Sequence, residues 1–202
     1  AISGANLTNL PASGIGEYIG SSIAISSDDS ALANDDGTDN KNVGIGLDAG
    51  ANITTGADNL AIGREALYGD ATSKLTGAAN LGFGFRAGYS LTSGIRNVFA
   101  GSEAGRYNSS GGRNIGIGEN ALNGNATSKL TGSYNTGIGF QAGFNLSTGQ
   151  YNVLSGSEAG KGITTASNSI AIGRRSMGLG VATGTDNVAI GQNTGYDLTS
   201  GE

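Results

Sequence analysis

The chain has 202 residues, of which 13% are charged, with a net charge of −5 and no Cys, His or Trp. The lack of cysteine excludes disulfides and thiolate metal sites, and the acidic balance argues against nucleic-acid binding, which uses a basic surface. Gly accounts for 38 residues and Pro for one, without the every-third Gly of collagen, so collagen and disorder both fit poorly. No run of about 18 apolar residues is present, so no membrane insertion is predicted.

Residues 1–41 lie outside the repeats described below and are predicted to form an N-terminal linker or capping segment. This segment contains an acidic cluster made of Asp28, Asp29, Asp35, Asp36 and Asp39. Calcium takes six to eight oxygen ligands, of which such a cluster could supply about three or four. A solvated loop is the preferred interpretation, so no metal site is predicted, and cation binding is left open.

From residue 42 to residue 202 one short phrase returns: an anchor residue, three apolar or small residues, and Gly. The anchors are Asn42, Asn59, Asn80, Asn97, Asn114, Asn135, Asn152, Ser169 and Asn187. Two short spacings of 17 residues and one of 21 make a unit of 55, and residues 59–113 match residues 114–168 at 28 of 55 positions. The region is therefore predicted to be a stack of similar coils that arose by tandem duplication.

Each phrase reads as a short strand, because its apolar residues lie two apart, as in Val43 and Ile45, and so share one face. The residue between them is small in most copies, and we expect the face of small residues to pack against another copy. A helix is excluded by the Gly density, at about 1 kcal/mol per Gly relative to Ala. A second small residue and a Thr/Ser/Gly turn follow, so each coil is predicted to hold two short strands and two tight turns.

These features predict an all-β protein, a parallel β-roll or β-solenoid of about nine coils. At about 4.8 Å per coil the rod is roughly 40–45 Å long. Few large apolar residues are available for one thin roll, so self-association as a homotrimer or a filament is expected. The anchor Asn side chains could form a ladder between coils, but a turn-forming side chain with no other duty is the preferred interpretation.

The candidate catalytic and cofactor sites are rejected, either because the spacing of their residues is wrong or because the same residues recur in a repeated motif. The Gly-x-Gly phrases lack the dinucleotide spacing and a following helix, and Gly156–Gly162 lacks the length and the Ser/Thr of a phosphate loop. Glu103 and Glu158 could pair as glycosidase carboxylates, yet they recur in the same motif, Gly-Ser-Glu-Ala-Gly, which indicates a structural role. No catalysis and no cofactor are predicted.

The most interesting surface feature of the sequence is the pair of loops in the long coils that carry the sequence Thr-Ser-Lys-Leu-Thr. The candidate contact residues are Thr72, Ser73, Lys74, Thr127, Ser128 and Lys129. The two loops are three coils apart and should project from the same side, about 14 Å from each other. A loop that tolerates insertion is the preferred interpretation; the alternative is a repeated contact with a host-cell glycan or protein, or with a neighbouring chain.

Two stretches resemble known families. Asn187-Val-Ala-Ile-Gly191 and Asn168-Ser-Ile-Ala-Ile-Gly173 resemble the head repeats of trimeric autotransporter adhesins, the YadA-like left-handed parallel β-roll, although the coils here are longer. Residues 2–11, Ile-Ser-Gly-Ala-Asn-Leu-Thr-Asn-Leu-Pro, resemble linkers of bacteriophage tail-fibre proteins. The resemblance implies a left-handed trimer located outside the cell, on a virion appendage or on a bacterial surface.

The resulting functional hypothesis is a virion structural protein, a segment of a phage tail fibre or similar appendage. Such a segment extends and presents a tip for host attachment. Two alternatives stay open: a bacterial surface adhesin of the trimeric autotransporter type, and a subunit of a self-assembling extracellular filament.

Overall fold

A computed structural model describes residues 17–19 by their backbone and residues 22–27, 30–36, 40–69, 72, 74–179 and 183–199 in full. The described residues form strands joined by turns, without a helix. The strands are β1 (Glu17–Ile19), β2 (Ser22–Ile25), β3 (Val43–Ile45), β4 (Leu60–Ile62), β5 (Leu81–Phe83), β6 (Val98–Ala100), β7 (Ile115–Ile117), β8 (Thr136–Ile138), β9 (Val153–Ser155), β10 (Ile170–Ile172) and β11 (Val188–Ile190).

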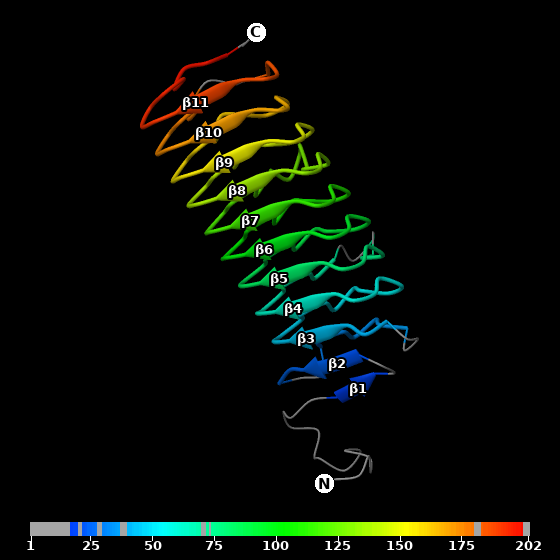
Figure 1. Ribbon diagram of the computed structural model, residues 1–202. Coiled ribbons are helices and arrows are strands. Elements are labelled where there is room, and N and C mark those ends of the chain that lie inside the picture. The colour runs from blue at the N-terminus through cyan, green and yellow to red at the C-terminus, as the bar shows by residue number, and fades with distance from the viewer. Residues whose placement is uncertain are drawn as a thin grey trace.

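The strands make one sheet in sequence order, in which β2 to β11 are parallel and β1 pairs antiparallel with β2. Equivalent residues pair in every step, as Val43 with Leu60 and Leu60 with Leu81, so each side-chain position forms a straight column along the rod. Figure 1 shows the coils stacked one above another from β2 to β11. The predicted parallel β-solenoid of about nine coils is confirmed, and its sheet begins on the N-terminal side of Asn42.

The interior of the solenoid is lined by the middle residue of each strand, which is Gly or Ala in most coils and is buried. The opposite wall is so close that a Cβ on Gly44 would lie 2.9 Å from the carbonyl oxygen of Ala49, and one on Gly116 3.1 Å from that of Ala121. The expectation that the small residues face another copy is therefore wrong. They face inward because in these coils the opposite wall leaves no room for a Cβ, whereas β6 and β9 bury Phe99 and Leu154 at the same position. The first and third residues of the strands point outward.

The 55-residue period has a packing cause. In the long coils Leu67 and Leu122 fill the interior at a position where short coils have Gly. A Cβ on Gly82 would lie 2.7 Å from Cγ of Leu67, and a Cβ on Gly137 2.8 Å from Cγ of Leu122. Each of these leucines thus requires a glycine in the next coil, and the coils cannot be exchanged one by one.

The side of the coil opposite the sheet is expected to hold a second strand. In the described residues it is built from turns, with isolated parallel bridges between Ile53 and Leu75 and between Asn108 and Leu130. Backbone hydrogen bonds nevertheless tie its coils together, for example from the N–H of Gly88 to the carbonyl of Ala104 at 2.8 Å. A buried column of mainly aliphatic side chains lies beneath this side: Ile53, Leu75, Leu91, Asn108, Leu130, Leu146 and Ile163.

Candidate functional site

The anchor residues form a hydrogen-bonded ladder inside the rod. The backbone N–H of Asn59 donates to Oδ1 of Asn42 at 2.9 Å, and its Nδ2 donates to the same oxygen at 3.2 Å and to the carbonyl of Gly77 at 3.0 Å. Bonds to the preceding anchor and across the coil recur at Asn80, Asn97, Asn114, Asn135 and Asn152. The preferred interpretation of a turn-forming side chain without other duty is wrong. Each anchor amide bonds to the anchor of a neighbouring coil and also to a backbone carbonyl on the other side of its own coil.

The ladder has a distinct start and a weak step. At the N-terminal side Oδ2 of Asp35 accepts hydrogen bonds from Nδ2 of Asn42 and from Oγ of Ser22, at 3.0 and 2.9 Å. At Ser169 the hydroxyl is too short to reach across the coil, and the contacts of Asn187 with it lengthen to 3.3 and 3.4 Å. The anchor residues predicted from the sequence are therefore structural, and the weakest step lies at the single Ser.

Ion pairs hold one corner of the rod. Glu103 pairs with Arg106 at 2.8 Å, and Glu158 pairs with Lys161 at 2.8 Å and with Arg175 of the next coil. The hydrogen bonds from Lys161 and Arg175 lower the pKa of Glu158 to about 2. A carboxylate paired in this way is a poor general acid, and the recurring Glu side chains fit a structural role.

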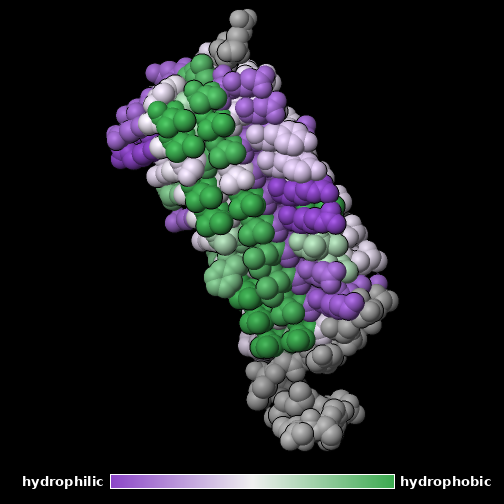
Figure 2. All heavy atoms as spheres, viewed as in Figure 1, coloured by the Kyte–Doolittle hydropathy of each residue, from purple (hydrophilic) through white to green (hydrophobic). Residues whose placement is uncertain are grey.

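A band of apolar side chains, called here the apolar face, is exposed along the sheet. Its exposed members are Ile23, Ile25, Phe83, Ile115, Ile117, Ile138, Val153, Ile172, Val188 and Ile190. They form two columns, one from the first and one from the third residue of each strand, and Phe83 is 55% exposed. Figure 2 shows this band in green over much of the length of the rod. The sequence predicts that these residues share one face, but it expects the opposite face of small residues, and not this one, to meet another copy.

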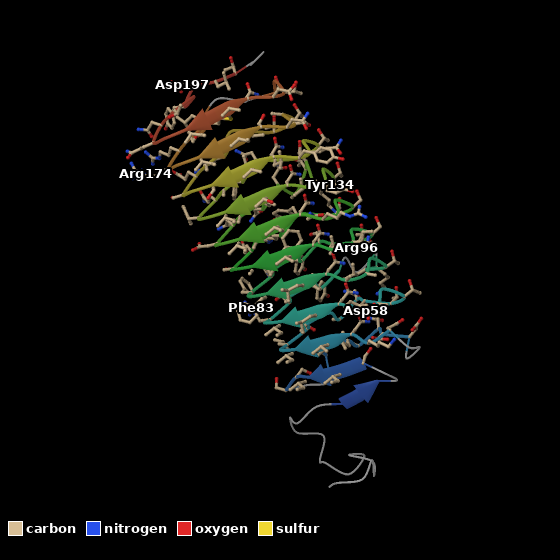
Figure 3. The ribbon with its side chains drawn as sticks, viewed as in Figure 1. Asp58, Phe83, Arg96, Tyr134, Arg174 and Asp197 are labelled. Carbon is tan, nitrogen blue, oxygen red and sulfur yellow. The ribbon has the colours of Figure 1, made fainter. Side chains whose placement is uncertain are left out.

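Each side of the apolar face is bordered by one further column. The leading edge is the residue before each anchor: Lys41, Asp58, Ala79, Arg96, Arg113, Tyr134, Tyr151, Asn168 and Asp186. The trailing edge is the residue after the Gly that ends each phrase: Leu47, Arg64, Phe85, Ser102, Glu119, Phe140, Ser157, Arg174 and Gln192. Figure 3 labels Asp58, Arg96 and Tyr134 on one side of the sheet and Arg174 on the other.

The long loops make hydrogen bonds within their own chain. Nζ of Lys74 donates to Oδ1 of Asn52 at 2.8 Å, and Oδ1 of Asn125 accepts from the N–H groups of Thr127 and Ser128 at 3.1 and 2.6 Å. Lys129 is half-buried, Thr72 is exposed, and Ser73 lies outside the described residues. The loop that tolerates insertion and the repeated contact point both stay predictions.

In the acidic segment, Asp28, Asp29 and Asp39 lie outside the described residues. In the part of the chain that the structure describes, no three Asp or Glu side chains converge as metal ligands would. Within the same residues no helix is long and apolar enough to cross a membrane.

The fold defines the class of the protein, a parallel β-solenoid with an Asn ladder inside and an apolar face outside. No protein-family model matches the chain, and no curated protein or solved structure matches it either. The resemblances to adhesin head repeats and to tail-fibre linkers stay predictions, as does the left-handed twist of the coil.

Proposed function

We propose that the chain is a structural segment of a homotrimeric fibre or surface appendage, which extends and presents a tip that attaches to a host or another surface. The observation behind this proposal is the apolar face, which follows the strands from β2 to β11. Isoleucines and a phenylalanine in water along a whole rod are expected to be covered by a partner of equal length. A second and third copy of the same rod have that length and that surface.

The size of the face fits such a partner. Nine steps of about 4.8 Å and two columns about 7 Å apart, with their margins, give roughly 600 Å². This equals the upper range of single patches on monomers, about 300–600 Å², and with the edges it approaches the roughly 800 Å² per partner of a stable interface. Because the apolar face is only two columns of side chains wide, the faces of three copies can surround one common axis. Both columns of each copy then point toward that axis.

The interior supports an extended, stiff function rather than a chemical one. Every coil from Asn42 to Asn152 is bonded to the next by strand pairing and by the anchor amides, so bending the rod would strain several bonds at each step. Most residues of the chain contribute to the length of the rod, as expected of a spacer that holds another part of a fibre at a distance. On this proposal the fibre lies outside the cell, and recognition of a host glycan or protein belongs to its tip or to its long loops.

The oligomeric state tests the proposal. Native mass spectrometry and analytical ultracentrifugation of the 202-residue chain should give a discrete trimer. Ile117→Glu, in the centre of the apolar face, should produce a folded monomer with an unchanged circular dichroism spectrum. Thr148→Glu, at an exposed turn away from the sheet, is the matched control and should stay trimeric. A wild-type monomer, or end-to-end filaments in electron micrographs, would contradict the proposal.

A further inference from the structure

We infer that the two edges of the apolar face bind each other between copies, and that Asp58 with Arg64 and Arg113 with Glu119 form ion pairs that fix a parallel, in-register assembly. The inference rests on the proposed self-association and adds which residues meet and in which register. In the coil of β4 the leading edge is acidic and the trailing edge basic, whereas in the coil of β7 the order is reversed.

The charges on the edges differ from those on the ion-paired corner. Glu65, Glu103 and Glu158 all pair with arginine or lysine of their own chain. Asp58 and Glu119 have no cationic partner among the residues that the structure describes. The carboxylates at the ion-paired corner thus have partners within the chain, whereas those of Asp58 and Glu119 do not and face outward.

The two facing arginines are likewise positioned at the surface. Arg64 is 54% exposed, with its guanidinium 4.5 Å from the ring of Phe85 and 4.0 Å from Glu65. Arg113 lies over Tyr134 at 5.1 Å and donates to its hydroxyl at 2.8 Å. Stacking on an aromatic ring orders each side chain while leaving donors of the guanidinium open to a carboxylate.

Backbone conformation gives a second observation. Every residue of the leading edge has a positive φ, between 54° and 61°, yet none is Gly, in a chain with 38 glycines. For a residue with a side chain this conformation costs about 1–2 kcal/mol, which Gly would avoid. The same conformation recurs at Glu65, Arg86, Glu103, Glu158 and Arg175, whose side chains form ion pairs within the chain. Asp58 and Arg96 make no such ion pair among the residues that the structure describes.

Symmetry determines which residues would meet. In a ring of parallel copies related by rotation about an axis along the rod, each residue has the same height in every copy. The leading edge of one copy then faces the trailing edge of the next at the same coil, so Asp58 faces Arg64 and Arg113 faces Glu119. An antiparallel pair would instead set each edge against itself, and the opposite charges of the two edges would not meet.

The register is also selective. In register there are two opposite-charge pairs and no like-charge pair along the described coils. A slip of one coil in one direction leaves only Arg96 with Glu119 and sets Lys41 against Arg64. A slip in the other direction leaves only Asp186 with Arg174. Like charges placed in contact are unfavourable, so the first slip is opposed by repulsion, whereas the second slip only loses one of the two opposite-charge pairs.

Disulfide trapping tests the inference, since the chain has no cysteine of its own. The double variant Asp58→Cys/Arg64→Cys should form covalent trimers on oxidation, seen on a non-reducing denaturing gel. An intrachain bond is excluded because the two edges are roughly 15–20 Å apart along an extended segment, beyond the 7 Å or so that a disulfide spans. The control Asp58→Cys/Glu119→Cys, offset by three coils or about 14 Å, should give no covalent trimer.

Charge exchange gives the second readout. Asp58→Arg and Arg64→Asp should each weaken association of the wild-type assembly by about tenfold or more, because like charges then meet at every interface. The double exchange should recover most of the affinity. A trimeric wild type without cross-links in the in-register variant, or without recovery in the double exchange, would overturn this inference alone. A monomeric wild type would overturn the proposed function and this inference together.

Discussion

Asn108 offers a direct test of how this solenoid is stabilised. It lies in the buried column on the side opposite the sheet, is fully buried, and has aliphatic counterparts in the adjacent coils, Leu91 and Leu130. Neither its Nδ2 nor its Oδ1 has a hydrogen-bond partner among the described residues. In the duplicated block the same position holds Ile163. We expect Asn108→Leu to stabilise the protein.

The magnitude follows from two contributions. An unsatisfied buried amide costs about 1–3 kcal/mol, and a leucine of nearly the same shape adds apolar burial of about 1 kcal/mol. Space is sufficient, because Leu91 and Leu146 already contact Gly94 and Gly149 in the way that Asn108 contacts Gly111. The sum is about 2–4 kcal/mol, which for a chain of this length raises Tm by roughly 5–12 °C.

Thermal and guanidinium denaturation followed by circular dichroism measure this change, at one fixed protein concentration because assembly adds to apparent stability. The matched control is Leu146→Asn, which introduces the same amide into the same column in another coil and should lower Tm. An unchanged or lower Tm for Asn108→Leu would refute the reasoning. It would mean that the Asn108 amide is already compensated, for instance by a buried water molecule.

Four further outcomes are expected. Asn114→Ala should lower the free energy of unfolding in urea by about 2–4 kcal/mol, because it leaves the buried N–H of Asn135 without its acceptor. Ser169→Asn should raise it by about 1 kcal/mol by completing the ladder. The lowered pKa of Glu158 means that its contribution is complete above about pH 4.5 and is lost as the pH falls through about 2. In thermal melts over that range the wild type should lose more stability than Glu158→Gln. Ala79→Gly, at a φ of 59°, should gain up to about 1 kcal/mol in the same urea assay.

The coils were predictable because the anchor and the terminal Gly recur at fixed spacings, and only a stack of equal units explains such spacing. Which face of the strand is buried was not predictable. The alternation of side chains along a strand means that Val43 and Ile45 point to one face and Gly44 to the other. It does not show which of the two faces points into the coil. The decision depends on the thickness of the coil, which is a property of the folded turn, where the Ala49 carbonyl lies directly opposite Gly44.

The Asn ladder was within reach of the sequence. A turn-forming Asn can be replaced by Asp, Ser or Gly, and a turn alone would therefore tolerate a mixture. The anchor is Asn in eight of nine phrases, which favours a role that needs both a donor and an acceptor in one side chain. A serine hydroxyl can also donate and accept, but at Ser169 it does not reach across the coil, whereas the amide donates across its coil and accepts from the next one.

The uniformity of the ladder has a consequence for assembly. The anchors from Asn59 to Asn152 are bonded in the same way, and the apolar face repeats aliphatic residues in most coils, with interruptions at Phe83, Ala100, Thr136 and Ser155. A rod that slid along its neighbour by one step would therefore keep most of its apolar contacts. The edge columns, by contrast, change from coil to coil, from Asp58 to Arg96 and Tyr134 on one side and from Arg64 to Glu119 and Phe140 on the other. Repeated positions hold each rod together, and the positions that break the repeat are the only ones able to define which coil of one copy meets which coil of the next.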